Sequence, residues 1–241
     1  PVFIVGNGIK RANKESEMRR LIEYTKIPTL LTWGAIDLLP DEHPQNLRDF
    51  GVTSNRIGNY VIDNSDLLIV IGSRLDTHEI VGDYKAHIRF DSDSKEFTTR
   101  ESDLEIKGDL KNTLGLLDNL TPVQKWADWG NRARLLRNQF KINYDADSVN
   151  PYNFFNKLSD MMPANEIMIT DAGQTLIWTM QSWKIKEGQN LFSAFNNSPM
   201  GYSLPASIGA FYASNKPINC FIGDGGFMMN SQEIETAIRL G

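Results

Sequence analysis

The sequence predicts an α/β protein with two doubly wound parallel-sheet domains, the second of them incomplete. Three observations lead to this fold class. Apolar runs of strand length, such as 67–71 and 218–222, alternate with helical patterns. Several runs end at a glycine, as at Gly72 and Gly223, which is typical of turns that follow strands. The alternation stops in the polar stretch 143–150 and then restarts, which indicates a second domain.

Residues 1–120 are predicted to form the first domain, a central domain of dinucleotide-binding type. Asn13 is expected to cap a helix whose apolar face carries Met18 and Leu21. A second helix is expected over 56–63. The predicted strands of this domain are 2–5, 29–32, 67–71, 86–90 and 104–106.

Residues 121–150 are predicted to be a linker with one helix, and residues 151–241 to be the first part of a second domain. Arg132, Arg134 and Arg137 lie in the helical pattern of the linker, and a solvated helix face is their expected position. In the second domain we expect strands at 167–170, 191–193 and 218–222, and helices at 175–183, at 200–214 and from 231.

Composition and charge exclude several functional classes. With 41% hydrophobic residues, 23% charged residues and a net charge of −5, the chain offers no basic face for a nucleic acid. Its apolar runs are far shorter than the roughly 20 residues of a membrane helix, and no secretory signal is visible. Cys220, the single cysteine, lies in an apolar run and is expected to be a small buried side chain in a reducing, cytoplasmic compartment.

The strongest local signal is Gly223-Asp224-Gly225-Gly226, which follows a predicted buried strand and precedes a helical pattern. Glycines let backbone N–H groups approach a phosphate closely, and the aspartate offers the hard oxygen ligand that Mg²⁺ prefers. The alternative is a tight turn in which Asp224 caps the following helix, and the four residues alone leave both interpretations open.

Several segments resemble the acetolactate-synthase-like family of thiamine-diphosphate-dependent enzymes. Residues 223–225 match the opening of the thiamine diphosphate motif, and residues 229–233 resemble the segment that follows it in acetolactate synthases. Residues 200–210 look like the family's MGFGLPAAIGA stretch, and residues 66–76 look like DLLIAVGARFD in its central domain. The resemblance spans nearly the whole chain and is weakest in residues 121–165.

The resemblance implies that this chain supplies part of a site for thiamine diphosphate and Mg²⁺. It assigns the metal to Asp224 and places the bulky Met200 beneath the bend of the cofactor. A core position explains Met200 equally well, because Leu204 and Ile208 follow it at helical spacing. Thr175 stands where the family has a histidine that contacts the diphosphate, so whether Thr175 makes this contact stays open. The residues implied to bind the cofactor are Gly173, Gln174, Thr175, Met200, Gly201, Asp224, Gly225 and Gly226.

No catalytic residue is expected within this chain. In the family, the glutamate that activates the cofactor belongs to an N-terminal domain, which would precede Pro1, and the asparagine that completes the Mg²⁺ site would follow Gly241. Glu233 is expected at the third position of a capping box with Asn230 rather than in catalysis. The 241 residues are therefore expected to be a fragment that is inactive alone.

The first domain raises the question of a second cofactor. Gly6-Asn7-Gly8 follows a strand, but Arg11 replaces the third glycine of G-x-G-x-x-G, so an NAD site is not expected. The resemblance implies FAD, because acetolactate synthases bind it on this domain. Surface charges at strand ends are the alternative, since Thr77-His78 departs from the family's acidic and basic pair. The matching residues are Arg74, Asp91 and Asp109.

The function implied by the resemblance is that of a carboligase or decarboxylase acting on a 2-keto acid such as pyruvate, within a homo-oligomer (a dimer or tetramer). Residues 51–54 lack the histidine of the family's MHGT-like segment, which leaves room for a thiamine-diphosphate lyase with a sugar-related substrate. A non-catalytic nucleotide-binding or regulatory module that keeps only the fold is the alternative of another class. No nucleic-acid or membrane partner is expected.

Overall fold

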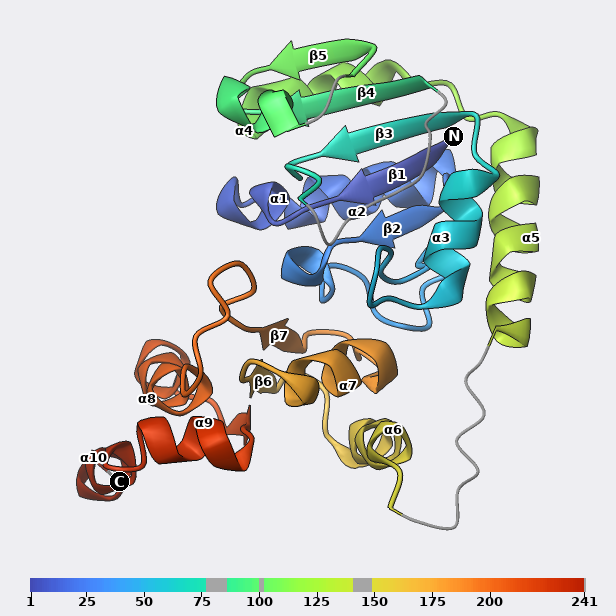
Figure 1. The fold of residues 1–241 in the computed structure, drawn as a ribbon. Helices are drawn as coiled ribbons and strands as arrows, with labels where there is room; N and C mark the ends of the chain where they lie inside the picture. Colours follow the sequence, from blue (N-terminus) through green and yellow to red (C-terminus); the bar gives the residue numbers. More distant parts are fainter. Residues whose placement is uncertain (77–85, 100–101, 141–148, 241) are drawn as a thin grey trace. The chain divides into compact units, whose positions relative to one another are not determined.

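The computed structural model describes residues 1–76, 86–99, 102–140 and 149–240 (Figure 1). The chain divides into two compact units, residues 1–142 and residues 143–241. Each unit is built on its own parallel sheet, of five strands in the first and three in the second. The predicted α/β class with two parallel sheets is therefore confirmed.

The sheet of the first unit has the strand order β2-β1-β3-β4-β5, and every pair of neighbours is parallel. The chain leaves β1 toward β2 on one side and later returns to form β3 on the other side. This reversal is the switch point of a doubly wound sheet. The strands are β1 (Val2–Val5), β2 (Thr29–Leu31), β3 (Leu67–Ile71), β4 (Ala86–Asp91) and β5 (Leu104–Lys107).

Helices connect these strands and extend the unit beyond β5. The α-helices are α1 (Gly8–Arg11), α2 (Glu15–Thr25), α3 (Arg56–Asp63), α4 (Leu110–Thr113) and α5 (Gln124–Gln139). The 3₁₀ helices are η1 (Trp33–Ala35), η3 (Ser94–Thr99) and η4 (Leu114–Asn119).

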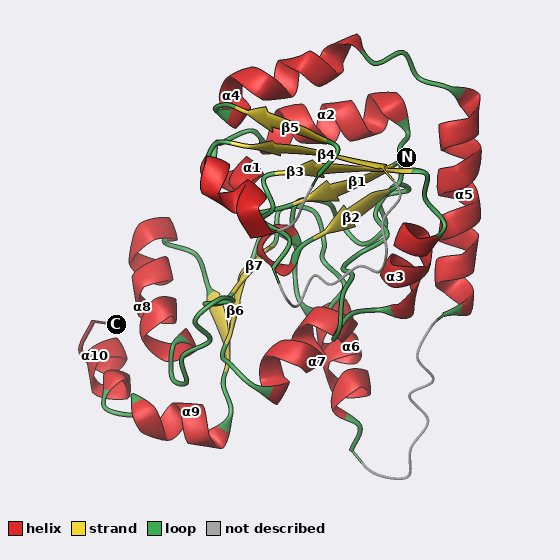
Figure 2. Ribbon diagram, turned by 45° about the horizontal axis from the view of Figure 1, so that its top comes forward, coloured by secondary structure: helices red, strands yellow, loops and turns green. Residues whose placement is uncertain are grey.

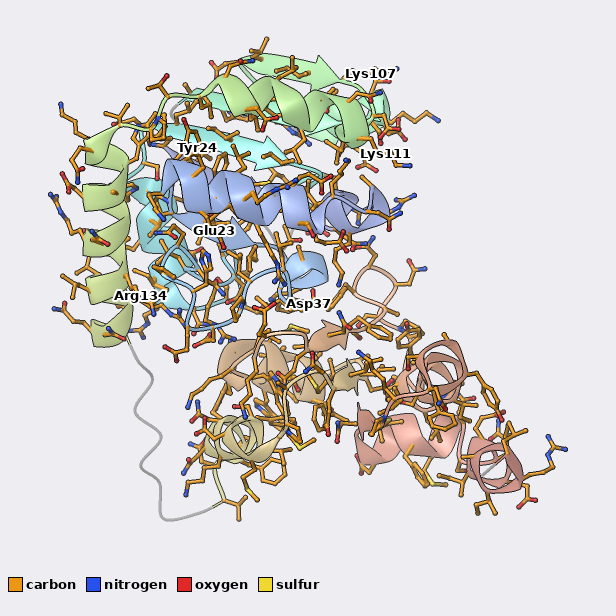
Figure 3. All side chains as sticks on the ribbon, turned by 180° about the vertical axis from the view of Figure 1, so that it is seen from behind. Glu23, Tyr24, Asp37, Lys107, Lys111 and Arg134 are labelled. Atoms are coloured by element: carbon orange, nitrogen blue, oxygen red, sulfur yellow. The ribbon has the colours of Figure 1, made fainter. Side chains whose placement is uncertain are left out.

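Helices bury both faces of the first sheet. Val2 and Ile4 point to the face covered by α3 and α5, where they join one hydrophobic cluster with Val61 and Ala133 (Figure 1). Because successive side chains of a strand point to opposite faces, the fully buried Phe3 faces the other side. Seen from behind, α2 lies across that other side (Figure 3). A parallel sheet needs this cover on both faces, which explains why its central strands β1 and β3 are apolar throughout.

Charged side chains fasten α5 to the loop that follows η1. Arg137 donates to the main-chain oxygens of Asp41 and Asn46, both at 3.0 Å, and to Asp41 Oδ1 at 2.7 Å. Arg48 donates to the same Asp41 Oδ1 at 2.6 Å. One turn earlier on the helix, Arg134 donates to the main-chain oxygens of Glu42 and His43. The helix is thus part of the first unit.

The expectation of a solvated face for the arginines of α5 is therefore wrong for Arg134 and Arg137. The side chain of Arg137 is 16% exposed and that of its partner Asp41 is 13% exposed. A guanidinium group presents several donors in a fixed fork, so one side chain can satisfy two carbonyl groups and a carboxylate at once. Their acceptors lie some 90 residues away along the chain, so the helical pattern could not reveal them.

The second unit contains a small parallel sheet with the order β7-β6-β8. Helix α8 lies on one side of it, and α6 and α7 lie on the other (Figure 2). The strands are β6 (Ile167–Thr170), β7 (Asn190–Phe192) and β8 (Ile218–Phe221). The helices are α6 (Pro151–Met161), α7 (Gln174–Ser182), α8 (Ser203–Ser214), α9 (Asp224–Met229) and α10 (Glu233–Leu240).

Aromatic side chains pack together in the second unit, beside the buried aliphatic residues of β6. The ring of Phe221 on β8 meets the edge of Phe155 on α6 and the ring of Trp183, with centroids 5.3 Å apart in both pairs. Among the described residues, β8 has β6 as its single strand partner, and its four side chains are only half-buried. The exposed large apolar side chains of α8, α9 and α10 are Phe211, Tyr212, Phe227, Met228, Met229, Ile234, Ile238 and Leu240.

Most predicted strands and helices agree with the structure to within one residue, and three details are corrected. Asn13 does not cap α2, because it adopts a left-handed conformation (φ +53°) and Lys14 is the N-cap. The helix expected from residue 200 begins at Ser203. Cys220 is half-buried rather than buried, since β8 is covered incompletely. No helix among the described residues has the length and apolar character needed to cross a membrane.

The Asp41 network allows a stability prediction. Burial by itself would raise the pKa of Asp41, but the charges of Arg48 and Arg137 outweigh it and hold this pKa below its usual value. Asp41→Ala removes the carboxylate that both guanidinium groups contact, and we expect a loss of about 3 kcal/mol in the free energy of unfolding at pH 7, measured by urea denaturation. The matched control is Glu42→Ala, since the Glu42 side chain is 90% exposed; its loss should stay below about 0.5 kcal/mol.

The same network determines in which direction the contribution of Asp41 to stability changes with pH. Because the pKa of Asp41 is lower in the folded chain than in the unfolded chain, its contribution to stability is present above about pH 4. It is lost as the pH falls through the folded-state value. The difference in stability between the parent and Asp41→Ala should therefore narrow below about pH 4. A difference that stays constant from about pH 3 to 7 would contradict the assignment.

Candidate functional site

The candidate site of the second unit lies where β6 and β8 end. These strands are parallel neighbours, with Thr170 beside Phe221, so their carboxyl ends meet at the same edge of the sheet. The N–H of Asp171 donates to the carbonyl of Phe221 at 2.8 Å and extends the pairing by one residue. Two turns therefore leave this edge together, one leading into α7 and the other into α9. Open parallel sheets bind ligands at such edges.

The turn after β6 brings backbone groups to the surface. Gly173 is the N-cap of α7 with φ +80° and ψ −148°, a conformation that disfavours any residue with a side chain. Gly173 and Gln174 are exposed. The N–H groups of Gln174 and Thr175 lie in the first helical turn, where backbone donors have no acceptor within the helix. A Cβ placed on Gly223 would lie 3.6 Å from Thr175 Oγ1, so the two turns are close neighbours.

The turn after β8 combines an exposed carboxylate with two crowded glycines. Asp224 is exposed at the start of α9. A Cβ on Gly225 would lie 3.1 Å from Met200 Cε, and a Cβ on Gly226 would overlap Asp171 Oδ2. A larger residue at Gly226 would have to displace a buried carboxylate. The predicted turn therefore forms, and Asp224 points away from the core rather than into it.

Met200 and Gly201 precede α8 and face the second turn. Met200 is 53% exposed and lies outside the helix, so its interpretation as a core residue in step with Leu204 and Ile208 is wrong. Gly201 is buried and has φ +83°. The structure thus brings all eight sequence-predicted cofactor residues to three neighbouring segments, 173–175, 200–201 and 224–226.

Asp171 is the residue of this region that the sequence analysis missed. Its side chain is 1% exposed, and its two oxygens accept hydrogen bonds from the N–H groups of Gly201 at 2.9 Å and Ser203 at 3.0 Å. Together with the contact at Gly226, this carboxylate touches both the segment before α8 and the turn after β8. The signal that could have found it is an acidic residue directly after the apolar run of a predicted strand.

The capping box expected for Glu233 is not formed. Helix α10 begins at Glu233, which therefore takes the first helical position rather than the third, and its N–H donates to the main-chain oxygen of Asn230. The side-chain amide of Asn230 instead donates to the carbonyl of Gly201 at 2.8 Å. The contact that decides this side chain's position is again distant in sequence.

The site provides one candidate metal ligand, Asp224. Within the described part of the chain, no group of three or more histidine, cysteine, aspartate or glutamate side chains is placed to hold a metal ion. A single exposed carboxylate suits Mg²⁺, which commonly takes one or two carboxylates and completes its shell with phosphate oxygens and water.

In the first unit, the three residues suggested for FAD lie at the carboxyl ends of adjacent strands. Arg74 follows β3 and lies 3.4 Å from Asp76. Asp91 ends β4 and accepts from the N–H of Asp93, and Asp109 caps α4 by accepting from the N–H of Lys111. The two aspartates therefore have local structural roles. Residues 77–78 lie outside the described residues.

The glycines after β1 serve backbone packing. The N–H groups of Gly6 and Gly8 donate to the carbonyls of Ile71 and Gly72, both at 2.9 Å. A Cβ on Gly8 would lie 2.6 Å from Gly72 Cα, and a Cβ on Gly6 would overlap the Gly72 carbonyl. The space over the first turn of α1, where a dinucleotide-binding fold would receive a pyrophosphate, holds the backbone of the β3 turn.

Comparison with known proteins agrees with this geometry. Residues 1–117 match the family model "Thiamine pyrophosphate enzyme, central domain", and residues 171–241 match "Thiamine pyrophosphate enzyme, C-terminal TPP binding domain". The second match contains all three segments of the candidate site. The first ends close to the end of η4, before α5 begins.

The chain is similar to acetolactate synthases, several of them named as large subunits. The isozyme 1 large subunit of Escherichia coli is 32% identical over 247 residues, which cover 98% of this chain and 43% of that protein. A probable acetolactate synthase large subunit of Methanocaldococcus jannaschii is 30% identical, over 98% of this chain and 43% of its own length. The large subunit of Lactococcus lactis is 29% identical, over 97% of this chain and 42% of its own length.

The chain thus spans less than half the length of these relatives. The two family models follow one another in the order of the two units, and each lies within one unit. On this basis the chain belongs to the thiamine pyrophosphate enzyme family and is similar to acetolactate synthase large subunits.

Proposed function

We propose that the complete protein carrying this chain binds thiamine diphosphate and Mg²⁺ and acts on a 2-keto acid such as pyruvate as a carboligase or decarboxylase. One observation carries the proposal. The turn at Asp224, Gly225 and Gly226 lies beside both Met200 and Thr175, at the edge where two parallel strands end. The names of the relatives, acetolactate synthases, support the substrate class.

The residues present fit a diphosphate group with a bound divalent cation. The first turns of α7 and α9 offer backbone N–H groups, and a Cβ on Gly173 would meet nothing within 4 Å, so the turn into α7 is open. The exposed Asp224 carboxylate would ligate the metal. The hydroxyl of Thr175 can donate a hydrogen bond where the family has a histidine. The dipoles of both helices favour negative charge at this edge.

The division of labour follows from this fit. When bound, thiamine diphosphate supplies the electron sink for breaking and forming the bond next to the keto carbonyl. The chain's own residues would hold the diphosphate end and, through Met200, would limit the positions open to the rings. The proton-transferring glutamate is proposed to come from another part of the complete protein. The 241 residues alone are therefore expected to show no turnover of pyruvate.

The remaining parts of the proposal rest on the family resemblance. The complete protein is proposed to be a cytoplasmic homo-oligomer, because family active sites lie between the domains of two subunits. FAD is proposed for the first unit, near Arg74, Asp91 and Asp109, on the resemblance alone, since the two aspartates already serve local turns.

Asp224→Ala in the complete protein should abolish Mg²⁺-dependent binding of thiamine diphosphate, with a loss of affinity of at least about 100-fold. The reason is that the metal would lose the one candidate carboxylate that the described residues place at this site. Isothermal titration with the cofactor, with and without Mg²⁺, measures the effect. Asp160→Ala is the matched control, since Asp160 is an exposed aspartate of the same unit and pairs with Lys184. A variant at 224 that binds with near-parental affinity would refute the assignment.

If the first unit binds a dinucleotide, we expect FAD rather than NAD. The contact between Gly8 and Gly72 and the presence of Arg11 argue against the NAD-type site over α1, whereas the positions that the resemblance implies for FAD, Arg74, Asp91 and Asp109, lie at other strand ends. Titrating the complete protein with each dinucleotide separately and following intrinsic fluorescence checks this expectation. Saturable binding of NAD would overturn it.

A further inference from the structure

The peptide groups on both sides of Gly201 are fixed by side chains from different elements. The N–H of Gly201 donates to Asp171 Oδ2 at 2.9 Å, and its carbonyl accepts from Asn230 Nδ2 at 2.8 Å. Asp171 follows β6 and Asn230 follows α9, so the two partners reach Gly201 from opposite ends of the unit's sequence. We call Asp171, Gly201 and Asn230 the Gly201 clamp.

The clamp selects one backbone conformation at Gly201, a residue that as a glycine could adopt several. Gly201 has φ +83°, and a Cβ there would lie 2.7 Å from Asn230 Nδ2 and 2.9 Å from Met229 Cβ. Asp171 is 1% exposed, so water cannot readily replace the N–H groups that its carboxylate accepts. Its second oxygen accepts from Ser203 and ties the first turn of α8 to the same point. The position of Gly201 is thus determined by three elements at once.

Met200 is the side chain whose position the clamp controls. It precedes Gly201 directly, it is 53% exposed, and its Cε lies 3.1 Å from the position of a Cβ on Gly225. An exposed, unbranched side chain has many rotamers and little packing to select one of them. The orientation of the peptide between Met200 and Gly201 is therefore the main restraint on where Met200 lies relative to the turn after β8.

We propose that Asp171 and Asn230 are positioning residues of the cofactor site, which act by holding Met200 over the turn at Gly225. This inference rests on the proposed function, since it takes thiamine diphosphate as the ligand. It goes beyond it by assigning two residues that would not touch the cofactor. Loss of the clamp should weaken the binding of thiamine diphosphate to the extent that it depends on Met200. It should leave the metal contact of Asp224 unchanged.

The test uses Asn230→Ala in the complete protein, because Asn230 is only half-buried and its loss should be tolerated. We expect the dissociation constant of thiamine diphosphate with Mg²⁺, measured by isothermal titration, to rise about tenfold, which corresponds to one lost hydrogen bond. Asn156→Ala is the matched control. Asn156 is also half-buried and donates from its amide to a main-chain oxygen, that of Ser182 at 3.3 Å, away from the site. It should change the dissociation constant less than about twofold.

A double-mutant cycle separates positioning from general stability. If Asn230 acts through Met200, then Met200→Ala combined with Asn230→Ala should bind the cofactor no more weakly than Met200→Ala alone. A purely structural role for Asn230 would instead give additive losses. Asp171→Asn is a second variant, since its amide N–H₂ would face one of the two backbone donors; it should weaken binding at least as much as Asn230→Ala. If this variant fails to fold, the cycle of Asn230 and Met200 still shows whether the clamp acts through Met200.

The outcomes are distinguishable. If the parent protein does not bind thiamine diphosphate with Mg²⁺, the proposed function fails and the clamp's role fails with it. If the parent binds but Asn230→Ala binds within twofold of Asn156→Ala, or if the losses in the cycle are additive, the proposed function stands and the positioning role is overturned.

Discussion

The arrangement of the second unit depends on the hydrogen bonds that the buried carboxylate of Asp171 accepts. A carboxylate removed from water is stable only if it is hydrogen-bonded, and here two backbone N–H groups meet that requirement. Both donors belong to the segment that opens α8, and Gly226 packs against one of the two oxygens. Any movement of these segments away from Asp171 would leave a charge unsatisfied in the interior, so the electrostatic requirement of one residue organises three loops.

The second unit uses two aspartates in opposite ways. Asp171 is buried and its oxygens accept hydrogen bonds from the backbone, whereas Asp224, after the neighbouring strand, is exposed. Aspartate thus stabilises the fold in one turn and is available as a ligand in the next. Parallel pairing of β6 and β8 is what brings these two uses to one edge of the sheet.

Sequence reasoning succeeded where the determining interactions are local. Apolar runs and glycines specify strands and turns, so the sheets and the turn at Gly223–Gly226 could be predicted almost to the residue. It failed for side chains whose partners are far along the chain. Arg137 looked like a solvated helix residue because Asp41 is 96 positions away, and Asn230 looked like a helix cap because Gly201 is 29 positions away. Such long-range pairings cannot be predicted from residue type and spacing.

The close contact between Gly8 and Gly72 has a consequence for engineering. Replacing Arg11 with glycine would complete the dinucleotide-binding pattern in the sequence, yet it would open no room, because the obstacle is main chain from another strand and not a side chain. Redesigning cofactor specificity in this unit would require a new path for the backbone after β3, which means rebuilding a loop rather than exchanging residues. Pattern matching alone would therefore overestimate how readily this fold accepts a nicotinamide cofactor.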